Sequence, residues 1–73
     1  MNSREKVYDA ILRHWQEYAM HPTVRWLADE LGGMSTNTIF YHISKLAEDG
    51  RVVMVNRHPV PVEIRDAIRK AGK

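Results

Sequence analysis

The sequence predicts one small domain of the mainly α (α+β) class, with three helices followed by a two-stranded β-hairpin. Three observations favour this class. Apolar residues recur at helical spacing in three successive segments, a β-branched run of strand length follows them, and Gly or Pro stands at the boundaries. A chain of this length buries only about 60% of its unfolded surface, so a single core is expected.

The first helix is predicted over residues 3–20. Asn2 is suited to cap its N-terminus, and Glu5, three residues later, is placed to reach back in a capping box. Pro22 ends the segment, because its ring disfavours helical geometry at His21. One face of this helix is apolar and is formed by Val7, Tyr8, Ile11, Leu12, Trp15, Tyr18 and Ala19.

Two further helices are predicted over 24–31 and 36–49. Thr23 and Ser35 are suitable N-cap residues for them, and Gly32 suits a left-handed position after the first of the two. The side chains expected to face the core are Val24, Leu27, Ala28 and Leu31 in the first, and Ile39, Ile43, Leu46 and Ala47 in the second.

Residues 51–62 are predicted to form the hairpin, with a turn at 56–58. Its returning strand contains Pro59 and Pro61. Because backbone N–H groups alternate sides along a strand, the two missing donors lie on the same side, which only an edge strand tolerates. The tail at 63–73 is predicted to be a short helix or a frayed end.

The turn between the second and third helices contains Gly32 and Gly33, and Met34 is expected to plug the space beneath it. A short turn with Gly, followed by a helix whose first residues are free, is the pattern of a helix-turn-helix. With the hairpin added, the order of elements predicts a three-helix winged helix-turn-helix with a C-terminal two-stranded wing, in one domain spanning 1–73.

The composition argues against several other classes of protein. The chain has no Cys, which excludes a disulfide framework or a thiolate metal site and fits a cytoplasmic location. No apolar run approaches the ~20 residues needed to span a membrane, and we expect no membrane contact. The net charge of +2 hints only weakly at a polyanionic partner, but no acidic residue occurs from Gly32 through Ala47.

The sequence also lacks the motifs of an enzyme or of a cofactor site. It contains no Gly-x-Ser-x-Gly motif and no Gly-rich phosphate loop. We therefore expect no catalytic residues, no cofactor and no metal. A zinc site is not expected, because the His residues form no i,i+4 pair and have no nearby carboxylate at ligand spacing. These residues are His14, His21, His42 and His58.

Residues 20–32 read MHPTVRWLADELG, and Ser35 and Asn37 follow. This stretch resembles the N-terminal DNA-binding domain of the LexA family of bacterial repressors. In that family Pro-Thr opens the second helix, Ala-x-x-Leu-Gly closes it, and Ser-x-Asn begins the recognition helix. The resemblance covers roughly residues 4–62 and implies a bacterial or phage transcriptional regulator. The resemblance also implies which residues contact base edges or nearby phosphates, namely Ser35, Asn37, Thr38, Phe40 and Tyr41.

Two departures from the family limit what the resemblance implies. LexA-like recognition helices carry a pair of Glu residues where this sequence has Phe40 and Tyr41, so a different operator is expected. The family's self-cleaving peptidase has no counterpart in these residues, so self-cleavage is not carried over.

A helical projection centred on the buried Ile39 places Asn37, Tyr41 and Ser44 on the opposite side. Asn is suited to a bidentate contact with adenine, and Tyr offers a phenol to a phosphate and a ring to a thymine methyl. The residues predicted to bind phosphate are Thr23, Arg25, Ser44, Lys45 and Arg51, and those predicted to enter the minor groove at the wing tip are Arg57 and His58.

Some of these residues have simpler explanations. Residues 36–38 also fit a cap-rich helix start with no further role, and Phe40 is more simply read as a rim residue that packs toward the wing. Arg57 and His58 can equally be ordinary residues of a hairpin tip. Trp26 is predicted to project away from the core, which suggests a homodimer or protein-partner contact unless the ring folds over a neighbouring helix.

The sequence therefore predicts sequence-specific binding of double-stranded DNA, with the third helix in the major groove and a dimer or a palindromic site. The alternative is a winged-helix module for protein–protein interaction. Its adhesive surface would consist of Trp26, Phe40 and Tyr41.

Overall fold

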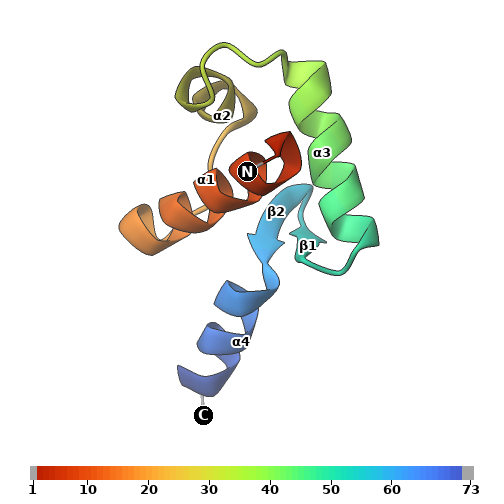
Figure 1. Ribbon diagram of the computed structural model, residues 1–73. Coiled ribbons are helices and arrows are strands. Elements are labelled where there is room, and N and C mark those ends of the chain that lie inside the picture. Colours follow the sequence, from red (N-terminus) through yellow and green to blue (C-terminus); the bar gives the residue numbers. More distant parts are fainter. Residues whose placement is uncertain (1, 72–73) are drawn as a thin grey trace.

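The computed structural model describes residues 2–71 and contains four helices and a two-stranded antiparallel sheet (Figure 1). The order of elements confirms the prediction of three helices followed by a hairpin, and it is compatible with a helix-turn-helix. Residues 72–73 of the predicted tail lie outside the described residues. The elements are α1 (Ser3–Tyr18), α2 (Val24–Glu30), α3 (Thr36–Glu48), β1 (Val52–Val55), β2 (His58–Pro61) and α4 (Val62–Ala71).

Helix α1 begins as predicted and ends two residues earlier than the predicted 3–20. The side chain of Asn2 accepts a hydrogen bond from the backbone N–H of Glu5 at 2.8 Å, so Asn2 is the N-cap. The capping box is only half formed, because the Glu5 carboxylate pairs with Arg51 instead. Ala19 adopts a left-handed φ of 56° and stops the helix.

Buried His14 explains the earlier end of α1. Its Nδ1 donates a hydrogen bond to the carbonyl oxygen of Met20 at 2.8 Å. This bond turns the chain back across the end of the helix, and Ala19 takes the left-handed conformation that the reversal requires.

Both glycine-containing helix ends form as expected, each one residue earlier than predicted. After α2, the N–H of Gly33 bonds to the carbonyl of Ala28 at 2.8 Å, and that of Gly32 to Asp29 at 3.3 Å. This is a Schellman motif, with Gly32 at a φ of 76°. The same pattern closes α3, where the N–H of Arg51 reaches the carbonyl of Leu46 at 3.0 Å.

The hairpin pairs Val55 with His58 and Val53 with Val60. Its turn has two residues rather than the predicted three, because Asn56 and Arg57 both have positive φ, as in a type I′ turn, and His58 begins β2. The sheet contains only these two strands, so the prediction of an edge strand is correct. In an antiparallel ladder, pairs that exchange hydrogen bonds alternate with pairs that do not. Pro59 and Pro61 both belong to pairs that exchange none, so neither position needs a backbone N–H.

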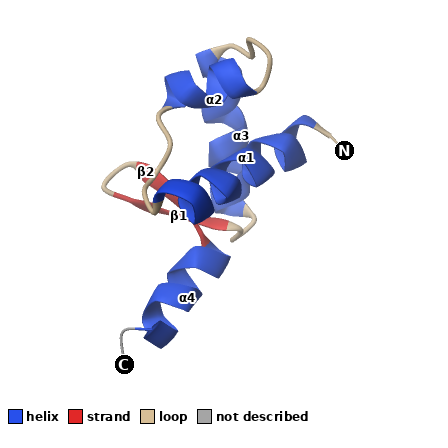
Figure 2. Ribbon diagram, turned by 90° about the vertical axis from the view of Figure 1, so that its left-hand side faces the viewer, coloured by secondary structure: helices blue, strands red, loops and turns tan. Residues whose placement is uncertain are grey.

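The core forms around α1, which contacts α2, α3 and β2 (Figures 1 and 2). Met34 is partly buried and packs against this core. On the opposite side of the core, Trp15 Nε1 donates to the carbonyl of Pro59 at 3.0 Å and ties the hairpin to α1. The buried apolar cluster consists of Val7, Tyr8, Ala10, Ile11, Leu27, Ile39, Ile43, Leu46 and Val52.

A polar cluster joins α1 to the base of the hairpin and to α4. The Arg51 guanidinium pairs with the Glu5 carboxylate and lies 4.1 Å from the centroid of the Tyr8 ring. The Tyr8 hydroxyl donates to Glu63 at 2.8 Å. Arg51 lowers the pKa of Glu5, whereas burial and the bond to Glu63 raise the pKa of Tyr8 to about 12.

Helix α4 leaves the end of the hairpin and points away from the rest of the molecule (Figures 1 and 2). The predicted tail is thus helical, and its helix begins one residue earlier, at Val62. Among residues 2–71, no helix combines the length and the apolar character that crossing a membrane requires.

The Tyr8–Glu63 contact predicts a pH-dependent stability. Tyr8→Phe should lower the free energy of unfolding by about 1 kcal/mol near neutral pH, because it removes one hydrogen bond. Because the pKa of Tyr8 is higher in the folded than in the unfolded chain, the neutral phenol stabilises the fold at any pH below its ordinary pKa of about 10. This stabilisation is lost as the pH rises from about 10 toward about 12. The difference between wild type and variant should therefore shrink over that range in urea titrations.

Tyr41→Phe is the matched control, because the structure gives the hydroxyl of this half-exposed residue no hydrogen-bond partner within residues 2–71. It should leave the free energy of unfolding unchanged at neutral pH. Equal losses in both variants would contradict a stabilising role for the Tyr8 hydroxyl.

Candidate nucleic-acid interface

Helix α3 divides into a buried and an exposed side, as the projection predicts. Ile39, Ile43 and Leu46 are buried. Phe40 and Tyr41 keep 55% and 54% of their surface exposed. Every residue of the predicted base-reading set is exposed, so the start of α3 presents Ser35, Asn37, Thr38, Phe40 and Tyr41 to solvent.

The small polar residues at the start of α3 are not equivalent. Ser35 Oγ accepts from the Thr38 N–H at 3.2 Å and lies 2.8 Å from Thr38 Oγ1. Both hydroxyls thus take part in the N-cap, as the simpler explanation of this stretch requires. The Asn37 amide makes no hydrogen bond to residues 2–71, so its full donor and acceptor capacity faces solvent.

Farther along α3, one cation lies beside the exposed aromatic. Lys45 Nζ is 3.4 Å from a carboxylate oxygen of Glu48 and 5.7 Å from the centroid of the Tyr41 ring. Such an exposed pair within a helix is weak, so Glu48 does not prevent Lys45 from approaching a phosphate. Ser44 is exposed on the same helix.

Arg51 occupies a different environment from the other predicted phosphate ligands. Its guanidinium pairs with Glu5 and lies over Tyr8, and the bond to Glu5 raises the pKa of Arg51. The charge is compensated inside the molecule. These contacts give Arg51 a structural role, and its phosphate contact stays a prediction.

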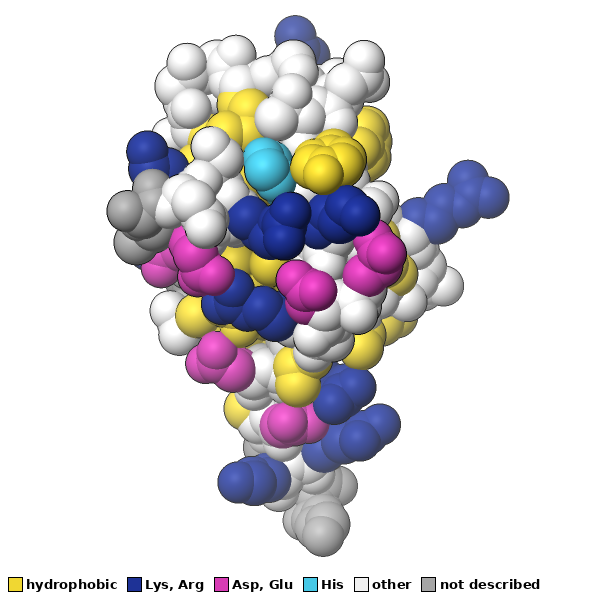
Figure 3. Space-filling view, turned by 45° about the vertical axis from the view of Figure 1, so that its right-hand side comes forward, with side chains coloured by type: hydrophobic (Ala, Val, Ile, Leu, Met, Phe, Trp, Pro, Cys, Tyr) yellow, Lys and Arg dark blue, Asp and Glu magenta, His cyan; other side chains and the backbone are white. Residues whose placement is uncertain are grey.

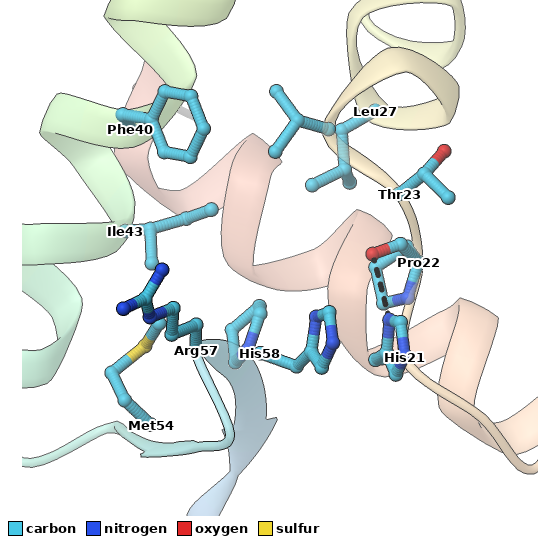
Figure 4. Close-up of a pocket in the computed structure, with 11 residues that line it drawn as sticks. His21, Pro22, Thr23, Leu27, Phe40, Ile43, Met54, Arg57 and His58 are labelled. Carbon is cyan, nitrogen blue, oxygen red and sulfur yellow. Dashed lines mark hydrogen bonds between the residues drawn. The ribbon is translucent and has the colours of Figure 1, made fainter.

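An apolar hollow of about 380 Å³ lies between the start of α2, α3 and the hairpin (Figure 4). Leu27 and Ile43 line it, and Phe40 borders it from α3. The geometry agrees with the interpretation of Phe40 as a rim residue. The hollow also brings together predicted contact residues from three elements, namely Thr23, Phe40, Arg57 and His58.

A pair of stacked imidazoles closes one side of this hollow. The rings of His21 and His58 lie with centroids 3.5 Å apart and planes 7° apart. The stack joins the segment before α2 to the hairpin tip and so holds these two parts of the candidate interface together. No sequence pattern marks His21 as part of this site, because its partner His58 lies far along the chain.

Arg25 is exposed next to the N-cap residue Thr23, whose side chain accepts from the N–H of Trp26 at 3.0 Å. The outward orientation predicted for Trp26 is wrong. The ring packs edge-on against His14 at 4.6 Å between centroids and is partly buried against the core. The rotamer carries the ring across to α1, which is the simpler of the two explanations considered.

The surface around the start of α3 carries fewer charged side chains than the surface below it. Figure 3 shows mainly uncharged groups in the upper part of the molecule, where α3 begins, and a mixed belt of basic and acidic side chains below it. The acid-free stretch from Gly32 through Ala47 accounts for this upper region. Along α3 the first carboxylate is that of Glu48, whereas the nearest acidic residues before this stretch are the exposed Asp29 and Glu30 at the end of α2.

The N-cap role of Ser35 predicts a loss of stability on truncation. Ser35→Ala should lower the free energy of unfolding by about 1 kcal/mol, because the Thr38 N–H loses its acceptor. Urea denaturation followed by circular dichroism measures this difference. Ser44→Ala, at an exposed position inside α3, is the control and should not destabilise the protein. A Ser35→Ala variant as stable as wild type would contradict the cap.

Comparison with protein-family models and with curated proteins finds no match for this chain. The resemblance to the LexA family therefore rests on the short motifs of residues 20–37. Function must be inferred from the chemistry of the exposed part of α3 and of the elements around the hollow.

Proposed function

We propose that this protein binds double-stranded DNA in a sequence-specific manner as a winged helix-turn-helix, with α3 in the major groove. The observation that carries the proposal is the exposed start of α3. It is polar and aromatic, free of acidic residues, and bordered by the start of α2 and by the hairpin tip. A protruding helix of this kind fits the width of the major groove.

The side chains of α3 suggest a division of roles. Asn37 is the residue best suited to read a base, because its unpaired amide can accept from and donate to an adenine edge. Tyr41 can contact a thymine methyl or a phosphate. Phe40 borders the hollow, so we assign it to packing beside the groove rather than to direct readout.

The surrounding residues supply phosphate contacts. Arg25 and Lys45 are cations near the two ends of this surface, and the Thr23 hydroxyl can donate to a phosphate while its oxygen caps α2. Arg57 lies at the turn of the hairpin, where a wing reaches toward the minor groove. The resemblance to the LexA family supports the same arrangement, and it favours a transcriptional regulator.

One alternative has a specific observation in its favour. Phe40 and Tyr41 are both more than half exposed, and Phe40 borders an apolar hollow that a partner's side chain could fill. A winged-helix protein-interaction module would use this surface. Trp26 contributes less than expected, since it is packed on His14.

A gel-shift selection against pooled random duplexes at two salt concentrations separates the two functions. Enrichment of one sequence motif, with weaker binding at higher salt, supports the DNA-binding proposal. Absence of any shift at low salt would refute it and leave the protein-interaction module.

Asn37→Ala should reduce affinity for the selected sequence by roughly 10- to 100-fold, because one bidentate base contact contributes about 1–3 kcal/mol of discrimination. Affinity for random duplex should change little. Fluorescence anisotropy with the two duplexes measures both effects. Gln16→Ala, which truncates an exposed amide of α1, is the control. Equal losses on both duplexes would refute a base-reading role for Asn37.

Lys45→Ala should weaken binding to specific and random DNA alike. The slope of log affinity against log salt should fall by about 1, because one phosphate contact no longer releases a counterion. The same anisotropy titrations at several salt concentrations give this slope. Arg13→Ala removes a paired cation from α1 and should leave the slope unchanged. An unchanged slope for Lys45→Ala would contradict the phosphate contact.

A further inference from the structure

Helix α4 carries an apolar stripe that the rest of the described molecule covers only in part. Ile64, Ala67 and Ile68 recur at helical spacing, and Ile68 keeps 59% of its surface exposed. The helix points away from the body, with its main contacts to β2 (Figures 1 and 2). In water, an exposed stripe of this kind favours contact with another apolar surface.

The same stripe borders an apolar groove. Trp15 and Ala19 at the end of α1 form one side of it, and α4 forms the other side. The groove has a volume of about 280 Å³, so the two helices do not close on each other. It leaves room for apolar side chains supplied from outside the chain.

The charges of α4 identify what can occupy this groove. Glu63, Arg65 and Asp66 lie in the first half of the helix, where Arg65 pairs with Asp66 at 3.4 Å, and Arg69 and Lys70 lie in the second half. Neither Arg69 nor Lys70 forms a salt bridge with any of residues 2–71. With two acidic and one basic residue the first half has a net charge of −1, and the two basic residues give the second half +2. A second α4 running in the opposite direction would place its basic half beside the acidic half of the first, whereas a parallel copy would bring like charges together.

We propose that two copies of this chain associate through α4, antiparallel about a two-fold axis near Ala67. Each copy lays its apolar stripe against the groove of the other. Such an isologous contact needs only one self-complementary surface. The charge pattern of α4 meets this condition, which is why a second copy fits better than an unrelated partner.

The contact is small. A helix of this length spans about 15 Å, and its stripe buries less than the ~800 Å² per partner typical of stable complexes. The dimer is therefore weak and depends on protein concentration. Its formation does not require DNA, so the proposal can be tested apart from the proposed function.

Sedimentation equilibrium of the full chain without DNA is the first test. Wild type should show a reversible monomer–dimer equilibrium between about 10 µM and 1 mM, the range in which weak complexes form. Ile68→Asp should raise the dissociation constant at least tenfold. Val55→Asp adds the same charge at a half-exposed apolar position of the hairpin and should leave the equilibrium unchanged. Circular dichroism verifies that both variants are folded.

Three results would overturn the proposal. They are a wild type that remains monomeric over the whole range, a dimer that Ile68→Asp does not weaken, and equal weakening by Val55→Asp. None of these results bears on whether the monomer binds DNA. Conversely, absence of a gel shift would refute the proposed DNA binding without affecting the sedimentation test of the dimer.

Cysteine cross-linking tests the antiparallel orientation, because the natural chain has no Cys. Ala67→Cys should form a disulfide between copies readily, since both residues lie near the two-fold axis. Lys70→Cys should not, because the two copies of residue 70 lie about 9 Å apart along the helix axes, beyond the span of a disulfide. Faster cross-linking at 70 than at 67 would refute the antiparallel arrangement.

Discussion

The position of the hairpin depends on Arg51. Its guanidinium pairs with Glu5 and lies over the Tyr8 ring, while its backbone N–H bonds to Leu46 and its carbonyl accepts from Val62. One residue therefore connects the end of α3, the base of the hairpin and the first turns of α1. Because these contacts involve both backbone and side chain, the hairpin is held at a defined angle to α3.

This constraint has consequences at the other end of the hairpin. With the base fixed by Arg51 and the returning strand fixed by Trp15, the hairpin tip meets the start of α2, and His58 stacks on His21. The hollow bordered by Phe40 is the space left between these elements. The parts of the candidate interface are thus arranged before any partner binds, which lowers the entropic cost of binding.

The features that the sequence predicted correctly depend on residues close together in the chain. The caps at Asn2 and Ser35, the Schellman turn at Gly32 and the edge strand marked by prolines all follow from local backbone chemistry. The structural role of Arg51 was missed, because Glu5 lies 46 positions away. Helical projection also failed for Trp26, since a large side chain can turn across its own helix to reach His14.

The start of α3 combines capping with the proposed recognition, and this would limit what one copy can read. The Ser35 and Thr38 hydroxyls bond to each other, so only one of their two protons is left to donate outward. The Asn37 amide is then the main source of directional hydrogen bonds. If α3 reads DNA as proposed, the Asn37 amide and the Tyr41 ring would discriminate few base pairs, and a second copy joined through α4 would double that number. The proposed pairing of two copies would therefore give so small a surface the specificity that one copy lacks.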